Sequence, residues 1–381
     1  MTVVARLLAV IQLVLAVRVF ARMAATPRGS RIERAGDGDL KIGQVTVLVP
    51  VLNEVDRLSP CLAGLAEQGP EVGAILVVDG GSTDGTPDLV RQWAAQDPRI
   101  RLVDASPVPA GVNGKAHNLH AGLQHAGAAP WVLTIDADVR PARGLVPALL
   151  NHADRERVPA LSAATRQRLS GPAEALLHPA MLTTLVYRFG IPGNATVDPE
   201  RVQANGQCFL VRRDVLDDAG GFARVLDSVC EDVTVARNIA QRGHRVGFYE
   251  VGDLAEVEMY AGWRDTWENW SRSLPMRDRH SGLAGRIGLA EVALVQAAPL
   301  WLAGLWSWRL GRREPAAMLN LALFMARIGV LGGTARAYVF VPPTWWLSPL
   351  ADLPVALRLI AMWRRRHHRR RGRDFISGDA A

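Results

Sequence analysis

The sequence predicts an α/β fold: a mostly parallel, mixed sheet flanked by helices, with membrane helices at the N-terminal and C-terminal ends. Between residues 45 and 260, short runs of Val, Ile and Leu alternate with amphipathic stretches, as expected for buried strands and the helices that cover them. The longest apolar stretches lie outside this region, near the two ends of the chain. The 381 residues suffice for two to three domains, and 35 Gly and 23 Pro spread along the chain exclude a coiled coil.

Alternating strands and helices define the central region. Four apolar runs predict strands over residues 45–52, 74–78, 101–103 and 131–135. Ser59 followed by Pro60 indicates an N-cap and a first helical position, and Thr86 followed by Pro87 repeats this signal. Further helical stretches follow over residues 116–126 and 144–154. Strand–helix–strand alternation implies parallel strands joined by right-handed crossovers, with ligands bound beyond the carboxyl ends of the strands.

The N-terminal segment predicts a membrane anchor over residues 1–25. Residues 7–17 are apolar except for Gln12, and Arg6 and Arg18 flank them. This run is shorter than the roughly 20 residues of a spanning helix, so we expect one tilted, snorkelling helix or an interfacial anchor. The arginines that follow the anchor place the next domain in the cytoplasm.

The C-terminal region, residues 283–366, predicts further membrane helices. Its apolar segments are residues 287–308, 316–341 and 345–363. Arginines follow the first and third segments, which indicates a hairpin of the last two and a re-entrant or interfacial first segment. Arg327 and Arg336 inside the second segment are costly in a membrane unless they are paired or snorkel. A soluble helical C-terminal domain is the alternative.

The net charge of +7 is unevenly distributed, because residues 364–373 hold seven arginines and two histidines. A nucleic-acid-binding tail is one interpretation of this run. Since the run directly follows an apolar segment, we favour a basic cytoplasmic tail over residues 364–381 that anchors a membrane helix, and we expect no nucleic-acid partner. The three cysteines show no metal-binding or disulfide spacing, which agrees with a cytosol-facing domain.

Polar groups follow three of the four predicted strands. Asn53 and Glu54 come after the first strand, Asp79 opens a Gly-Ser-Thr-Asp-Gly loop after the second, and Asp136 and Asp138 come after the fourth. Turn chemistry alone explains one such loop. Three loops at successive strand ends indicate a single site along one edge of the sheet.

Asp136 and Asp138 are the predicted metal ligands. Only Ala137 separates them, so both carboxylates can approach one cation where the strand ends. Oxygen ligands suit Mg²⁺ or Mn²⁺, and Mg²⁺ commonly binds one or two carboxylates together with substrate phosphates. Such a cation would neutralise a departing diphosphate. The chain has no GxxxxGK[ST] and no GxGxxG after the first strand, which argues against a P-loop NTPase and a dinucleotide-binding fold.

Two helix starts add charged candidates. Lys115 follows Gly114 at the start of a predicted helix, where a cation beside helix amides can contact a donor phosphate. Glu231 and Asp232 begin an amphipathic helix. The helix dipole alone also favours acidic residues there.

Residues 45–250 resemble the family 2 glycosyltransferases of the GT-A fold. The resemblance is carried by these segments: Pro50 to Glu54, the Val-Val-Asp-Gly-Gly-Ser-Thr-Asp-Gly-Thr run, Gly114-Lys115, Asp136-Ala137-Asp138, Gly220-Gly221-Phe222 and Glu231-Asp232. It implies a GT-A catalytic domain over residues 42–282. The residues that it assigns to the donor nucleotide are Pro50, Asn53, Glu54, Asp79, Gly80, Lys115 and Asp136. Gly80 stands where the family often has a second acidic residue.

The resemblance also implies catalytic roles. The aspartate matching Asp138 is the family's firmest metal contact, and the one matching Asp232 is the general base of inverting members. Glu231 is the second catalytic candidate. Arg272 is a candidate diphosphate contact in a segment with tryptophans at 263, 267 and 270. These tryptophans share one helix face, at a membrane surface or in a buried helix, and the Gln-x-x-Arg-Trp motif of processive synthases is absent.

The whole chain resembles membrane-bound glycosyltransferases that act on lipids. We therefore predict an inverting, metal-dependent transfer of a hexose from a nucleotide diphosphate sugar, UDP-linked, to the hydroxyl of a carotenoid, hopanoid or other membrane lipid. The expected partners are the nucleotide-sugar donor, the lipid acceptor and the bilayer, with the catalytic domain facing the cytoplasm. The alternatives are transfer to polyprenyl phosphate and a non-catalytic membrane scaffold that binds nucleotide sugars.

Overall fold

The computed structural model describes residues 2–25, 29–34, 42–276, 282–364, 367–370 and 373–376, and the chain divides into two compact units. The α/β unit is formed by residues 29–167, 192–259 and 366–381. The helical unit is formed by residues 1–28, 168–191 and 260–365. The catalytic domain predicted over residues 42–282 thus divides between the units, since its residues 168–191 and 260–282 belong to the helical one.

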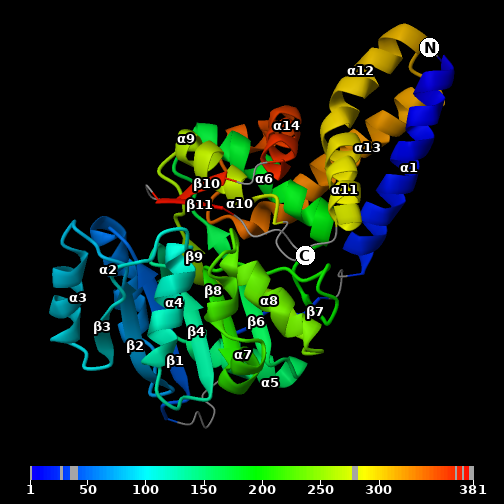
Figure 1. The fold of residues 1–381 in the computed structure, drawn as a ribbon. Coiled ribbons are helices and arrows are strands. Elements are labelled where there is room, and N and C mark those ends of the chain that lie inside the picture. The colour runs from blue at the N-terminus through cyan, green and yellow to red at the C-terminus, as the bar shows by residue number, and fades with distance from the viewer. Residues whose placement is uncertain are drawn as a thin grey trace. The chain divides into compact units, whose positions relative to one another are not determined.

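A mixed sheet forms the centre of the α/β unit (Figure 1). Its strands are β1 (Val45–Val51), β2 (Val72–Asp79), β3 (Ile100–Asp104), β4 (Trp131–Ile135), β5 (Val139–Pro141), β6 (Ala160–Gln167), β7 (Asn194–Thr196), β8 (Cys208–Arg212) and β9 (Val246–Val257). The order is β3-β2-β1-β4-β8-β6-β9-β5, with β7 paired to β9. The first four strands are parallel, as predicted, and β8 lies antiparallel between β4 and β6. This arrangement confirms the predicted α/β class.

Helices cover the sheet of the α/β unit. They are α2 (Val55–Ala66), α3 (Thr86–Ala94), α4 (Gly114–Gln124), α5 (Leu145–Glu156), α7 (Arg213–Asp218), the 3₁₀ helix η1 (Phe222–Val225) and α8 (Glu231–Gln241). Helix α3 begins at the predicted Thr86-Pro87 signal. The prediction for α2 was wrong, because α2 begins at Val55 and holds Pro60 inside it. Its start is fixed from another loop, where the Asp84 carboxylate accepts the Val55 N–H at 3.1 Å.

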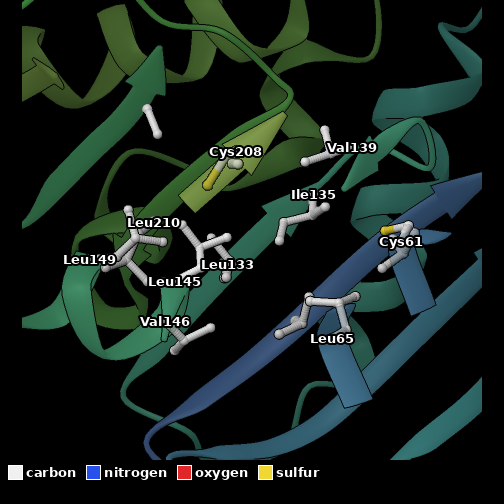
Figure 2. Close-up of a cluster of buried hydrophobic side chains, with 14 of the residues drawn as sticks. Cys61, Leu65, Leu133, Ile135, Val139, Leu145, Val146, Leu149, Cys208 and Leu210 are labelled. Carbon is white, nitrogen blue, oxygen red and sulfur yellow. The ribbon is translucent and has the colours of Figure 1, made fainter. Parts of the chain in front are cut away.

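Aliphatic side chains from β4, β8 and α5 form part of the main core of this unit, as Figure 2 shows. Leu133, Leu145, Leu149 and Leu210 are fully buried there. Each such side chain stabilises the fold by about 1.5–3 kcal/mol relative to exposure. The packing fixes the ends of the strands, and with them the loops that carry the candidate site.

The helical unit contains the chain's candidate membrane spans. Its elements are α1 (Thr2–Ala24), α6 (Pro172–Phe189), α9 (Trp263–Asp265), the π-helix η2 (Thr266–Trp270), α10 (Ser271–Ser273), α11 (Gly282–Glu291), the π-helix η3 (Val292–Ala297), α12 (Ala298–Leu310), α13 (Pro315–Thr334), the 3₁₀ helices η4 (Ala335–Ala337) and η5 (Pro343–Ala351), and α14 (Asp352–Trp363). Three helical stretches among the described residues are long and apolar enough to cross a membrane: Thr2–Ala24, Gly282–Leu310 and Pro315–Ala337.

The hairpin of long helices differs from the expected one. Helices α12 and α13 pack against each other and against α1 through a cluster that includes Ala5, Trp306 and Ala316 (Figure 1). Residues 345–363, expected to form one arm, belong instead to a 3₁₀ helix and a 12-residue helix.

The predicted basic tail contains two short paired strands, β10 (His367–Arg370) and β11 (Arg373–Ile376). Its residues 365–366, 371–372 and 377–381 lie outside the described part.

Ion pairs lie inside the helical unit. Arg327 of α13 meets Asp352 through two hydrogen bonds, Nε to Oδ2 at 2.8 Å and Nη2 to Oδ1 at 3.0 Å. Gln296 of η3 donates to the same carboxylate at 2.8 Å. In the last turn of α1, Arg22 pairs with the buried Glu291 at 2.9 Å. The pairing that the sequence required of Arg327 is therefore present.

Candidate active site

Two loops at the carboxyl ends of β1 and β2 are joined by hydrogen bonds. Asn53 follows β1 with a positive φ of 54°, which an asparagine tolerates better than most residues. Its side-chain oxygen accepts the Thr83 N–H at 2.9 Å, and its own N–H donates to the Ser82 hydroxyl at 2.8 Å. Pro50 lies within β1 itself, opposite Val78 of β2. The two predicted donor loops thus form one surface.

The Asp79 carboxylate ends β2 and organises the loop that follows it. It accepts the backbone N–H groups of Gly81 at 3.2 Å and of Ser82 at 3.0 Å, and the Ser82 hydroxyl also donates to it. Gly80 lies close to Asn118 of α4, since an added Cβ would stand 2.9 Å from its amide nitrogen. Asp79 and Gly80 are therefore held in a tightly packed turn at the strand end.

Lys115 is the centre of the second part of the site. Its ammonium group lies 2.6 Å from the Asp136 carboxylate at the end of β4 and 3.0 Å from the Glu231 carboxylate at the start of α8. The lysine side chain is only 12% exposed. The cation thus joins two acidic groups that the sequence separates by about a hundred residues, and it does so where little water screens the charges.

Asp232 faces the same space from the start of α8. An added Cβ on Gly206 would lie 2.5 Å from the Lys115 ammonium and 3.0 Å from the Asp232 Oδ2 atom. Only a glycine lets these two groups come so near the backbone of residue 206. Burial, and next the charge of Glu231, raises the pKa of Asp232 to about 6. A carboxylate with this pKa is ionised at neutral pH and remains basic enough to accept a proton.

Asp138 comes just before β5, and the charges that act on its carboxyl group include those of Asp136, Arg57 and Glu54. Burial, and next the Asp136 charge, raises the pKa of Asp138 to about 7, while Arg57 opposes this shift. Glu54, at the N-terminus of α2, pairs with Arg57 at 2.7 Å. The Oδ1 atom of Asp138 is buried and has no hydrogen-bond partner within the described part of the chain.

The structure brings Lys115, Asp136, Glu231 and Asp232 into one cluster, with the Asn53, Glu54 and Asp79 loops at neighbouring strand ends. The structure does not place the Arg272 side chain in this cluster. Its backbone lies in α10 of the helical unit, and its side chain is outside the described residues. Its role as a diphosphate contact stays a prediction.

Residues 46–220 match the sequence family described as Glycosyl transferase family 2. These residues form a family 2 glycosyltransferase domain. The match confirms the family that the strand-end motifs indicated.

Among the proteins similar to this chain are two curated proteins and one solved structure. The succinoglycan biosynthesis protein ExoA of Rhizobium meliloti is 34% identical over 59 residues, which are 15% of this chain and 18% of that protein. The N-acetylglucosaminyl-diphospho-decaprenol L-rhamnosyltransferase of Mycobacterium tuberculosis is 26% identical over 262 residues, covering 59% of this chain and 81% of the relative. The mannosyltransferase PcManGT of Pyrobaculum calidifontis, solved with GDP-Man and Mn²⁺, aligns with a TM-score of 0.53 at 22% identity, covering 93% of this chain and 99% of that one. The last similarity confirms the predicted GT-A fold.

The carboxylates of the glycosyltransferase domain fit a divalent cation in number and chemistry. No group of three or more His, Cys, Asp or Glu side chains is arranged around a metal position among the residues that the structure describes. Two carboxylates suffice for Mg²⁺ when substrate phosphates complete its shell. The buried, unpartnered oxygen of Asp138 is the observation that favours this residue as a ligand.

Sequence reasoning missed two residues of the candidate site, Asn113 and Gly206. Asn113 is the N-cap of α4, and its side chain contacts the start of α8. An asparagine before a predicted helix is an N-cap signal, so the cap itself could have been found. The contact with α8 has no local signal, because it joins residues 118 positions apart. Nothing in the sequence marks Gly206 as a position of close approach.

Proposed function

We propose that this chain transfers a hexose from a nucleotide diphosphate sugar, with UDP as the nucleotide, to a hydroxyl group of a membrane lipid, with inversion at the anomeric carbon. The observation that carries the proposal is the cluster of Lys115, Asp136, Glu231 and Asp232 at the strand ends of a family 2 glycosyltransferase domain. Open α/β sheets bind their ligands beyond the carboxyl ends of the strands.

The donor nucleotide lies, in this proposal, along the joined loops after β1 and β2. Asn53 and Asp79 hold these loops in shape, and Pro50, Glu54 and Gly80 line the same segments. Backbone and carboxylate groups that are already fixed lose little freedom when they bind a ligand. This rigidity supports the assignment of the loops to the nucleoside.

In this proposal, Lys115, Asp136 and Asp138 bind the diphosphate. The ammonium group of Lys115 lies near enough to Asp136 for both side chains to lie beside the same phosphate group. Asp136 and Asp138 are the residues that would hold Mg²⁺ or Mn²⁺. When bound, the cation supplies charge neutralisation for the leaving nucleoside diphosphate. Lys115 adds a second positive charge on the protein side.

Asp232 acts as the general base. In one step, the Asp232 carboxylate takes the proton of the acceptor hydroxyl, the hydroxyl oxygen bonds to the anomeric carbon, and the bond from that carbon to the diphosphate oxygen breaks. Attack opposite the leaving group inverts the configuration. The pKa of about 6 supports this role, as does the nearby Glu231, whose negative charge makes Asp232 more basic.

The three apolar helical stretches support an integral membrane protein, and the arginines at residues 22, 28, 31 and 34 support a cytoplasmic catalytic domain. This anchoring supports a lipid acceptor. Accessibility of a protease site engineered into the tail, measured on sealed vesicles of known sidedness, tests the orientation.

A second candidate acceptor is a sugar carried on a polyprenyl diphosphate. The observation that favours it is the similarity to the mycobacterial rhamnosyltransferase, whose name specifies an N-acetylglucosaminyl-diphospho-decaprenol acceptor. In that case the acceptor hydroxyl belongs to the carried sugar, and Asp232 plays the same role. Transfer directly to a polyprenyl phosphate is the third form of lipid acceptor.

One experiment separates these possibilities. Membranes containing the full-length chain are incubated with radiolabelled UDP-, GDP- and dTDP-hexoses and Mg²⁺, and lipids are extracted. We expect label in the lipid phase; label only in water-soluble polymer would overturn the proposal. Mild acid then leaves simple glycosides intact and releases the label from both polyprenyl-linked products, as a labelled disaccharide from the carried sugar and as a labelled monosaccharide from polyprenyl phosphate.

A matched variant tests catalysis against mere binding. Asp232→Asn keeps the size of the side chain and removes the base, so transfer should fall at least about a hundredfold while donor binding persists. Full activity of this variant would refute the base assignment. A wild-type chain that binds donors and transfers nothing would instead support the scaffold alternative.

A further inference from the structure

We infer that Asn113 is a positioning residue for the catalytic end of α8: it holds the Glu231 carboxylate in place and thereby orients Asp232. The inference rests on the proposed function, in which Asp232 is the base. It adds a residue to which the sequence analysis gave no part in binding the donor or the metal. The juxtaposition that carries it is the buried hydrogen bond between the N-cap of α4 and the first residue of α8.

Asn113 uses both ends of its side-chain amide. The oxygen accepts the backbone N–H groups of Lys115 at 3.0 Å and Ala116 at 3.4 Å, which caps α4. The nitrogen donates to the Glu231 carboxylate at 3.0 Å and to the Ser228 carbonyl at 2.8 Å. Since the residue is 1% exposed, no water competes for these bonds.

The Glu231 carboxylate is held from two sides by the start of α4. Its Oε1 atom pairs with Lys115, and its Oε2 atom accepts from Asn113. Two fixed contacts on two oxygens leave one orientation for the carboxylate. The backbone of Asn113 adds a third tie, because its N–H donates to the Leu226 carbonyl at 2.7 Å.

Asp232 is the next residue along the chain, so the position of the Glu231 side chain fixes the first turn of α8 and the base on it. Within the described residues, the Asp232 carboxylate is otherwise held by its own turn of helix, where it accepts the Val233 N–H at 2.8 Å. A shift of about 1 Å at a catalytic group can cost about a hundredfold in rate. A loss of the Asn113 amide donor should therefore appear in the chemical step.

Two variants keep the cap and remove the donor. Serine and aspartate are both good N-cap residues, so Asn113→Ser and Asn113→Asp should retain α4. Serine cannot reach Glu231, and aspartate places a second negative charge beside it. We expect kcat for sugar transfer to fall at least about tenfold in Asn113→Ser and further in Asn113→Asp, with the donor KM within about threefold of wild type.

Leu123→Ala is the matched control, because it removes buried methyl groups from the last turn of the same helix. It should lower the melting temperature at least as much as the Asn113 variants and leave kcat within about twofold. Equal losses of kcat in this control and in the Asn113 variants would mean that any loosening of α4 impairs transfer, and would overturn the inference.

A double-mutant cycle tests whether Asn113 acts through Glu231. In the Glu231→Ala background, Asn113→Ser should reduce kcat by no more than about threefold, because its partner is already gone. Full multiplication of the two single losses would overturn the inference, as would wild-type kcat in both Asn113 variants. A wild-type chain that transfers no sugar would overturn the proposed function, whereas sugar transfer that the Asn113 variants leave unchanged would overturn only the role of Asn113. The two failures are therefore distinguishable.

Discussion

Gly206 leaves the space in which Lys115 and Asp232 approach each other. Its backbone is not in the left-handed region, so alanine fits the chain itself, and the obstacle is the 2.5 Å separation between an added Cβ and the Lys115 ammonium. The end of a lysine side chain moves at little cost. A methyl group added at Gly206 should therefore change the site and leave the fold intact.

Gly206→Ala should displace the Lys115 ammonium from Asp136 and Glu231. Because Lys115 serves the donor diphosphate in our proposal, we expect the donor KM to rise about tenfold, the loss of one charge-assisted contact. Steady-state kinetics measures this, with melting temperature as the check on folding. Gly304→Ala, where an added methyl meets no atom within 4 Å, is the control. An unchanged KM would contradict the placement of Lys115.

The pH dependence of transfer should report the ionisation of Asp232. Its pKa is raised to about 6, first by burial and then by Glu231, and only the deprotonated form accepts a proton. Thus kcat/KM should be level above about pH 7 and fall about tenfold per unit below pH 6. Glu231→Gln removes the neighbouring negative charge, so it should move this fall to lower pH. A profile that stays level down to pH 5, or a shift to higher pH, would contradict the assignment.

Several elements were predictable because their signals are local. Apolar runs indicated β1 and β4, and Thr86-Pro87 indicated the start of α3. The start of α2 was not, since Asp84 caps it from a loop some thirty residues away. The antiparallel insertion of β8 and the pairing of Lys115 with Glu231 are likewise products of tertiary contact. The residue types of the site could be predicted from the sequence, while the side chains that they contact could not.

The start of α2 gives a test of this tertiary cap. Asp84→Ala removes the acceptor for the N–H groups of Val55 and Thr86 and for the Thr86 hydroxyl, at 3.1, 3.0 and 2.6 Å. We expect a loss of about 1–2 kcal/mol in the free energy of unfolding, as for other lost caps. Thermal unfolding measures it.

Asp88→Ala is the control for that variant, because Asp88 is an exposed residue in the first turn of α3 whose partner is Arg91. Loss of such an exposed pair should change stability by less than about 1 kcal/mol. If both variants have the same melting temperature, the cap on α2 contributes nothing measurable.

For the molecule as a whole, the distribution of charge matters more than its sum. The excess of basic residues is seen near the two ends of the sequence, while Arg22 and Arg327 of the candidate membrane helices are paired inside the helical unit. A paired charge is tolerated in an apolar environment, whereas a single one is costly. The sequence could state this requirement for Arg327 but not name its partner, because Asp352 lies in a segment that was expected to be one long apolar helix.

The Arg327–Asp352 pair should therefore control the stability of the helical unit. Arg327 is 1% and Asp352 2% exposed, and Gln296 also donates to the carboxylate. Arg327→Met leaves a buried carboxylate without its cation, so we expect a loss of about 3–5 kcal/mol, seen as a lower melting temperature in detergent. The double variant Arg327→Met/Asp352→Leu removes both charges and should be more stable than Arg327→Met alone. If the double variant were the less stable of the two, the two charges would not be acting as a pair.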